Sequence, residues 1–255
     1  MNDVLDFHLA DLAPADADSE YAEQRFWLSD LTVLAEYRAT PYGSPSYVVA
    51  HDGSVTWGVP GKSQIAAIKV ARDLKLNKFT VETAYHATVS FAQNWLIEKG
   101  CPPERMARVG DEFVNPADDL TVRIEQQVRE SGTRYEVLDS RTSDFDPCET
   151  WTLARDSSTG QAPIRLFLEE WGQDVGTYTM REGAFADEDA ARCWLKERSS
   201  PLPRPPEFRG EATALQTRAA LARSDGASAM PKVGVDAHRT PPAGTTHRPN
   251  PGRSM

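Results

Sequence analysis

The segment GVPGKS (58–63) carries the Gly-Lys-Ser ending of a phosphate-binding loop. In that motif a glycine-rich loop lets backbone N–H groups surround a phosphate. Thr56 stands where the first glycine of the motif is required, and Pro60 removes one of the N–H donors. The residues before the loop are also predicted to form a hairpin strand, not the buried parallel strand that such loops follow. We therefore expect Lys62 and Ser63 to begin an ordinary helix, without a nucleotide site.

Other residue types that carry catalysis or bind metals show no local pattern. No two histidines have metal-ligand spacing, and none is close in sequence to a cysteine: His8, His51, His86, His238 and His247. The chain has no G-x-S-x-G nucleophile motif. Glu169 and Glu170 are adjacent, so on a strand they would point to opposite faces, and the acids at 187–189 suit a helix N-terminus. We expect no metal and no cofactor, and a pair of catalytic carboxylates would have to be assembled by the fold.

Residues 70–87 (VARDLKLNKFTVETAYHA) resemble the core of a helix-turn-helix, with apolar positions, a turn, and Thr-Val opening a second helix. Lys75 stands at the usual turn glycine, where a Cβ disfavours the positive φ that the turn needs. The resemblance implies contacts with nucleic acid or another partner by five residues: Lys75, Asn77, Lys78, Thr83 and His86. The alternative is two core helices that meet at a loop.

The charge of the chain is unevenly distributed. The 255 residues carry a formal charge of −10, made up of −14 over residues 1–198 and +4 over 199–255. Residues 62–99 carry +3 within the acidic part. An acidic body disfavours long-range attraction to nucleic acid or anionic membranes and favours a basic partner. No apolar run is long enough to cross a bilayer, so we expect no membrane partner.

Cysteine usage and the N-terminus both bear on the compartment. The cysteines are three in number and include no C-x-x-C pair: Cys101, Cys148 and Cys193. An odd number cannot form a complete disulfide framework, which favours a reducing compartment. The first 24 residues also lack the basic residues of a secretory signal. The sequence therefore predicts a cytoplasmic protein.

The elements that would position these residues are predicted to form an α+β body over residues 25–198, after an acidic, partly flexible N-terminus (1–24). Two segments, 31–75 and 150–198, each read as a three-stranded β-meander followed by a helix. Their similarity indicates an internal duplication, with chance resemblance of a common motif as the alternative. They are expected to form two small sheets or one continuous antiparallel sheet.

Helices and a tail complete the prediction. Apolar residues at helical spacing predict helices over 79–99 and 116–130, and a strand is expected over 133–141. Nine of the 18 prolines lie in 199–255, so this basic segment is expected to be a disordered tail, with one short helix at 211–226. The sequence thus predicts a non-catalytic cytoplasmic binding or regulatory protein, of unknown oligomeric state, that contacts protein or nucleic acid. The alternative is a small hydrolase whose carboxylates meet only in the fold.

Overall fold

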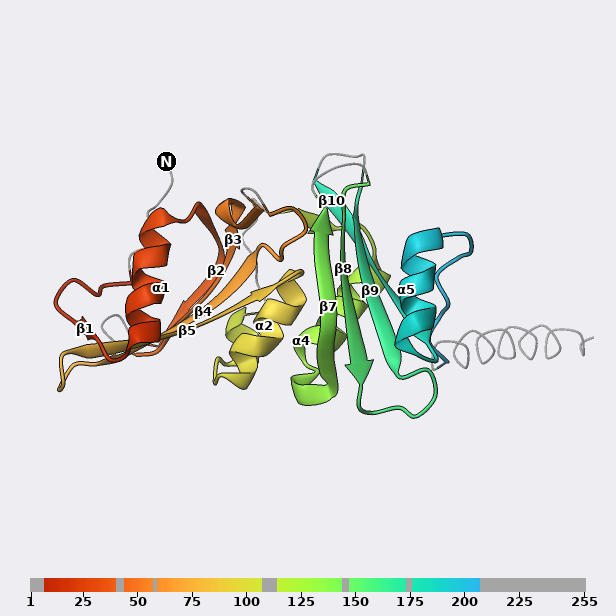
Figure 1. Ribbon diagram of the computed structural model, residues 1–255. Helices are drawn as coiled ribbons and strands as arrows, with labels where there is room; N and C mark the ends of the chain where they lie inside the picture. Colours follow the sequence, from red (N-terminus) through yellow and green to blue (C-terminus); the bar gives the residue numbers. More distant parts are fainter. Residues whose placement is uncertain are drawn as a thin grey trace, which may run out of the picture. The chain divides into compact units, whose positions relative to one another are not determined.

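The computed structural model describes residues 7–39, 44–56, 59–106, 114–143, 147–172 and 176–206. All described residues belong to the first compact unit of the chain, residues 1–210 (Figure 1). The short helix predicted at 211–226 and most of the predicted tail lie outside the described residues. The first unit has the predicted α+β class, with its strands in two five-stranded sheets within the described ranges.

The first half of the unit, residues 13–98, builds one sheet and its two covering helices. Its elements follow in the order β1 (Ala13–Pro14), α1 (Ala17–Leu28), β2 (Leu31–Arg38), β3 (Ser46–Asp52), the short 3-10 helix η1 (Gly53–Thr56), β4 (Ile65–Asp73), β5 (Lys78–His86) and α2 (Val89–Glu98). The strand order in the sheet is β1-β5-β4-β3-β2, antiparallel except for the parallel pair β1 and β5. A four-residue helix, α3 (Pro103–Met106), follows α2.

The second half, residues 115–197, repeats this order of elements. They are β6 (Asn115–Pro116), α4 (Asp119–Arg129), the 3-10 helix η2 (Gly132–Arg134), β7 (Tyr135–Ser143), β8 (Glu149–Asp156), β9 (Ile164–Trp171), β10 (Thr177–Phe185) and α5 (Glu188–Glu197). The strand order β6-β10-β9-β8-β7 matches that of the first sheet position by position. The strand predicted at 133–141 is confirmed as β7. The helix predicted at 116–130 is confirmed as α4, except that it begins at Asp119, because Asn115 and Pro116 pair with β10 as β6.

Local hydrogen bonds match between the halves as well. In the first half the Ser19 hydroxyl, near the start of α1, accepts a hydrogen bond from the backbone N–H of Val81, 3.0 Å away. In the second half Thr121 of α4 accepts one from the N–H of Met180 at 3.1 Å. Both hydroxyls therefore tie the first turn of a helix to the fourth long strand of its sheet. That the halves arose by duplication stays a prediction.

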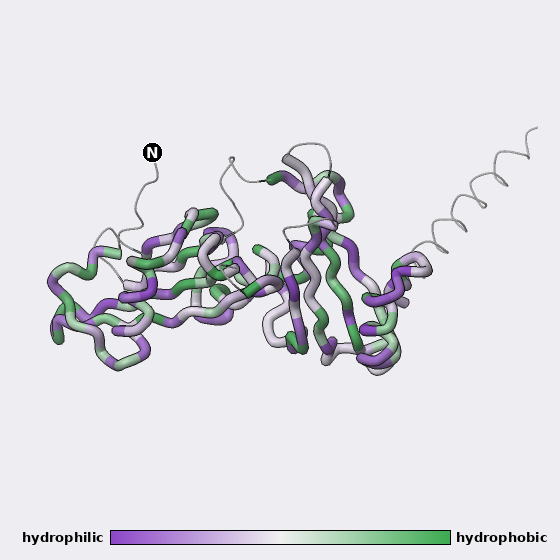
Figure 2. Tube along the Cα trace, turned by 45° about the horizontal axis from the view of Figure 1, so that its top comes forward, coloured by the Kyte–Doolittle hydropathy of each residue, from purple (hydrophilic) through white to green (hydrophobic). Residues whose placement is uncertain are grey.

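The helices and sheets form alternating layers (Figure 1). Phe26 of α1 packs on one face of the first sheet and Leu96 of α2 on the other. Val128 of α4 packs on one face of the second sheet and Ala191 of α5 on the other. Helices α2 and α4 contact each other, and Phe91 of α2 belongs to the same core cluster as Val128. Because helices cover both faces of each sheet, hydrophobic residues run along the strands of both (Figure 2).

The helix predicted over residues 62–75 is wrong: this segment contains strand β4. Ala66, Ala67, Ile68 and Val70 are all fully buried, so apolar residues occupy both faces of the strand. A strand buried on both faces has apolar residues at nearly every position, and such a run also satisfies helical spacing. The spacing that indicated a helix was therefore a property of a doubly covered strand.

The helix-turn-helix prediction for residues 70–87 is also wrong. The segment is the β4–β5 hairpin, in which Asp73 pairs with Lys78 and Val70 with Val81. The residues of β5 alternate apolar and polar, with β-branched residues among them, which favours a strand. Only Val89–Glu98 of the helix predicted over 79–99 is helical.

The two predicted units also differ in how they fit the structure. The unit at 150–198 is confirmed as β8, β9, β10 and α5. The unit at 31–75 comprises the strands β2, β3 and β4 without a helix, because the helix that closes this half is α2, after a fourth strand. Helix α1, within and beyond the predicted flexible N-terminus, was not predicted. The predicted duplication therefore pairs β2 with β8, whereas in the structure β2 occupies the position that β7 has in the second sheet.

Candidate functional site

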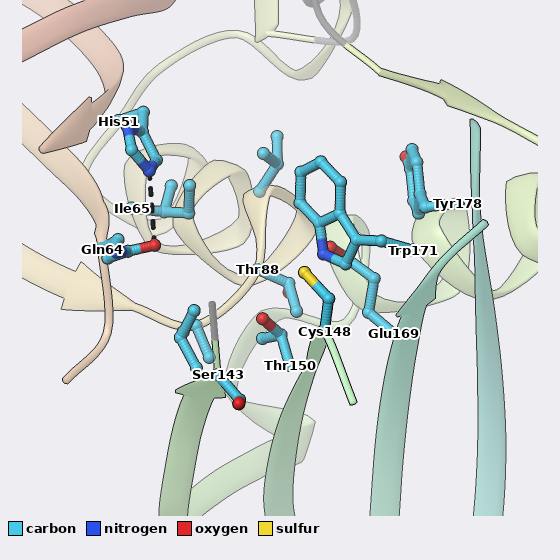
Figure 3. Close-up of a pocket in the computed structure, with 13 residues that line it drawn as sticks. His51, Gln64, Ile65, Thr88, Ser143, Cys148, Thr150, Glu169, Trp171 and Tyr178 are labelled. Atoms are coloured by element: carbon cyan, nitrogen blue, oxygen red, sulfur yellow. Dashed lines mark hydrogen bonds between the residues drawn. The ribbon is translucent and has the colours of Figure 1, made fainter. Parts of the chain in front are cut away.

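A cavity of about 200 Å³ lies where the strand ends of both sheets meet the N-terminus of α2 (Figure 3). We call it the Glu169 cavity. It is lined by β3 and β4 of the first sheet, the start of α2, and β7, β8, β9 and β10 of the second sheet with their flanking residues. The lining residues are His51, Gln64, Ile65, Ala87, Thr88, Val89, Thr142, Ser143, Cys148, Thr150, Glu169, Trp171 and Tyr178.

Glu169 is a buried carboxylic acid on β9. Its side chain lies on the α4-covered face of the sheet, two residues after the core residue Phe167. Only 9% of Glu169 is exposed, and within the described residues no group donates a hydrogen bond to its carboxyl. Burial, with a smaller contribution from the nearby acid Glu125, raises the pKa of Glu169 to about 8. At neutral pH the cavity therefore contains a mostly protonated acid that can donate one hydrogen bond and accept others.

A second acid and two aromatic rings lie next to Glu169. The Tyr178 hydroxyl donates a short hydrogen bond to Glu125 of α4. Burial raises the pKa of Glu125, although the hydrogen bond from Tyr178 opposes that change. Burial and the Glu125 charge together raise the pKa of Tyr178. The rings of Trp171 and Tyr178 have centroids 6.4 Å apart and both line the cavity. The cavity lining thus combines the Glu169 carboxyl with two π systems, and Glu125 lies outside that lining, bonded to Tyr178.

The remaining polar lining consists of imidazole, amide, hydroxyl and thiol groups. His51 Nε2 lies 3.3 Å from Gln64 Oε1, at the first-sheet side of the cavity (Figure 3). The Thr142 hydroxyl is buried and has no hydrogen-bond partner among the described residues. Cys148 is exposed and forms no disulfide. Buried polar groups normally have partners, so an unpartnered hydroxyl and an unpartnered carboxyl in one cavity favour a polar ligand there.

Metal chemistry finds no support in the described ranges, where no three His, Cys, Asp or Glu side chains gather closely enough to hold an ion. Nor is any helix among the described residues long and apolar enough to span a bilayer. The arrangement can instead bind a polar or charged group through Glu169 and the two rings.

The structure separates the residues that the sequence singled out for partner contact. Lys75 and Asn77 lie in the turn of the β4–β5 hairpin, and Lys78 begins β5; Asn77 has a left-handed backbone with φ of 50°. Leu74 and Leu76 of the same turn are 60% and 67% exposed. These lysines are accessible at the hairpin tip, far along β5 from the Glu169 cavity. Partner contact by them stays a prediction.

Thr83 and His86 lie farther along β5. Thr83 is exposed, but an odd separation from Lys78 places the two on opposite faces of the strand. His86 is half-buried 6.4 Å from the ring of Trp95, and its Nε2 has no hydrogen-bond partner among the described residues. Burial lowers the pKa of His86 to about 4, so the ring is neutral near pH 7. The five predicted contact residues thus do not share one surface.

The Gly-Lys-Ser segment, predicted to begin a helix, instead forms hydrogen bonds with β7 of the second half. The N–H of Thr142 on β7 donates to the carbonyl of Gly61, and Ser63 Oγ lies 2.9 Å from Ser140 Oγ. Gly61 has φ of 87°, a backbone conformation that favours glycine. The segment therefore covers the outer edge of β7, which would otherwise be an open edge strand.

A second group of charges is buried under α4 and belongs to the core. Arg165 of β9 is fully buried, with Asp156 Oδ2 3.1 Å and Glu182 Oε1 3.4 Å from its guanidinium nitrogens. Asp156 also accepts two hydrogen bonds from Arg134. Burial opposes ionisation of Asp156, but the bonds from Arg134 and Ser158 outweigh it and lower the pKa. This network is compensated internally, unlike Glu169.

Sequence reasoning noted Glu169 only as the neighbour of Glu170. Along β9, Ile164, Leu166 and Leu168 alternate with Arg165, Phe167 and Glu169, which places Glu169 on the more polar face of the strand. The available signal was Phe167, an aromatic residue on the supposedly polar face. That face is covered by α4, a contact between segments far apart in sequence.

Compared with models of known protein families, with curated proteins and with solved structures, the chain matches none of them. The geometry of the Glu169 cavity is therefore the basis for a functional conclusion.

Proposed function

We propose that this protein is a non-catalytic, cytoplasmic binding protein that takes the positively charged group of a small amine into the Glu169 cavity. One observation carries the proposal: the Glu169 carboxyl is buried, faces a cavity, and has no hydrogen-bond partner among the described residues. Buried charged groups are normally paired. The missing partner of this acid is, in our proposal, supplied by the ligand.

A cation fits this site better than an anion or an apolar group. An ammonium group would form an ion pair with ionised Glu169 and donate hydrogen bonds to its carboxylate. It would also contact the faces of Trp171 and Tyr178, as cations do in aromatic sites. Glu125 adds negative potential on the same side. The charge of −14 over residues 1–198 acts in the same direction by attracting cations at long range.

The cytoplasmic part of the proposal is supported by the thiols. Cys101, Cys148 and Cys193 form no disulfide, and Cys148 and Cys193 are exposed. Exposed free thiols persist in a reducing compartment.

The alternative function, a hydrolase with two carboxylates, has one supporting observation, which is the proximity of Glu125 to Glu169. However, Glu125 is hydrogen-bonded to Tyr178 and is not among the residues that line the cavity. A two-carboxylate mechanism needs both acids at the substrate. Binding without catalysis is therefore the better-supported proposal. Contact with nucleic acid rests only on the hairpin lysines, since the predicted recognition helix is a strand.

The test is calorimetric titration of the full chain with n-butylamine, against n-butanol as the neutral probe of similar size. Because Glu169 is protonated below its pKa of about 8, amine binding should release about 0.9 proton at pH 7. Proton release is measured by repeating the titration in buffers of different ionisation enthalpy. Affinity should rise about tenfold per pH unit from pH 6 to 8 and level off above pH 8.

Two variants provide the control. Glu169→Gln should abolish both amine binding and proton release, whereas Glu170→Gln changes the exposed neighbour and should leave both intact. Absence of amine binding by the folded protein, or equal binding by the Glu169→Gln variant, would refute the proposed function.

A further inference from the structure

The N-terminus of α2 is the second charged feature of the Glu169 cavity. Ala87, Thr88 and Val89, which precede and begin the helix, all line the cavity. The first N–H groups of a helix lack intrahelical partners and carry a partial positive charge. The cavity thus has a positive end at α2 and an acid at Glu169.

This helix start differs chemically from the others. Among the described residues, α1, α4 and α5 are each capped by an aspartate whose side chain accepts a backbone N–H: Asp16, Asp118 and Asp187. Each of those helices also has an acid in its first turn. Helix α2 has neither, because its N-cap Thr88 makes no capping hydrogen bond and its first turn holds no acid. The positive end of α2 is therefore uncompensated by its own N-cap and first turn.

Glu169 does not fill that role either. It lines the same cavity and is nine-tenths buried, yet no N–H of the described residues donates to it. The cavity therefore contains two groups without a hydrogen-bond partner among the described residues. The N-terminus of α2 favours an anion, and Glu169 favours a cation. The unpartnered Thr142 hydroxyl is a further hydrogen-bonding group at the same cavity.

We infer that the ligand is a small amino acid, whose carboxylate binds the α2 N-terminus while its ammonium group binds Glu169. This inference rests on the proposed function, since it adds a carboxylate to the amine proposed above. One molecule would then satisfy both ends of the cavity. Carboxylates are the ligands that helix N-termini favour.

The first arm of the test compares ligands on the unaltered protein. Calorimetric affinities are measured for n-butylamine, butyrate, and the series glycine, β-alanine, 4-aminobutanoate and 5-aminopentanoate. At least one amino acid of the series should bind tenfold or more tightly than n-butylamine, and the best chain length reports the separation of the two ends. Butyrate alone should bind weakly, because it leaves Glu169 without a cation.

The second arm changes the helix start. Thr88→Asp places an acid at the N-cap, as Asp187 does in α5, so it should compete with the ligand carboxylate and reduce the advantage of the amino acid at least tenfold. The matched control is Asp187→Thr, which removes the cap of α5 outside the cavity and should leave every affinity within twofold. Circular dichroism verifies folding, and the ligand series decides even if the Thr88→Asp variant does not fold.

The outcomes separate the two proposals. If n-butylamine binds and no amino acid of the series binds more tightly, the amino-acid inference is overturned and the proposed function stands. If neither amines nor amino acids bind, both fail. An amino acid that binds best, loses its advantage in Thr88→Asp and loses binding in Glu169→Gln supports both.

Discussion

Replacing Glu169 by glutamine should stabilise the protein, and the gain should depend on pH. Glutamine has the shape of the protonated acid but carries no ionisable proton. In the folded protein the pKa of Glu169 is raised from an ordinary 4.5 to about 8. An acid with a raised pKa binds its proton in the folded state and has lost it in the unfolded state between these two values. The unaltered protein therefore loses stability, relative to the variant, as pH rises from 4.5 to 8.

The size of the effect follows from the pKa separation. Each pH unit within that window changes the free energy of unfolding by about 1.4 kcal/mol. The two proteins should be equally stable near pH 4.5. The variant should be more stable by about 2 kcal/mol at pH 6 and about 3 kcal/mol at pH 7, approaching about 5 kcal/mol above pH 8. Such a gain is a large part of the stability of a typical domain.

Urea denaturation followed by tryptophan fluorescence at pH 5, 6, 7 and 8 measures these differences. Glu170→Gln is the control, because the exposed Glu170 on the same strand should give a nearly constant difference. A constant difference for Glu169→Gln over the same pH range would show that Glu169 titrates near its ordinary pKa. The argument that the acid is desolvated, and needs a cation, would then be wrong.

Two further predictions concern the core. Arg165→Met leaves Glu182 buried without its cation, so the free energy of unfolding should fall by about 3–5 kcal/mol in urea denaturation, and a loss below about 1 kcal/mol would contradict a fully buried network. Ser19→Ala and Thr121→Val each leave a buried strand N–H unsatisfied, at Val81 and Met180. Each should cost about 1–3 kcal/mol by the same assay, and a cost in only one half would show that the two tethers are not equivalent.

Local signals in the sequence sufficed for the second half of the fold. The alternation of Ile164, Leu166 and Leu168 predicted a strand that the structure contains as β9. Helical spacing over 116–130 and the acids at 187–189 predicted the helices α4 and α5, although the N-cap of α4 is Asp118. Both faces of β9 are buried, but one of them carries the polar Arg165 and Glu169, so the alternation along this strand remains visible. In the first half β4 is apolar on both faces, so its apolar residues fit the spacing of a helix as well as that of a strand. Which of the two forms depends on pairing with β3 and β5, which is a tertiary contact.

The candidate site could not be predicted from local sequence patterns, because it also depends on tertiary contacts. The α+β class, the acidic charge of residues 1–198 and the lack of a complete disulfide framework follow from composition and local pattern, so they could be predicted from the sequence. That α4 covers the face of β9 that bears Glu169, and that α2 begins at the same cavity, depends on contacts between distant segments. The pKa of an acid depends on its surroundings, and those of Glu169 include Glu125 of α4, more than 40 positions away in the chain. A neighbouring pair of glutamates therefore reads as surface charge until the fold removes one of them from water.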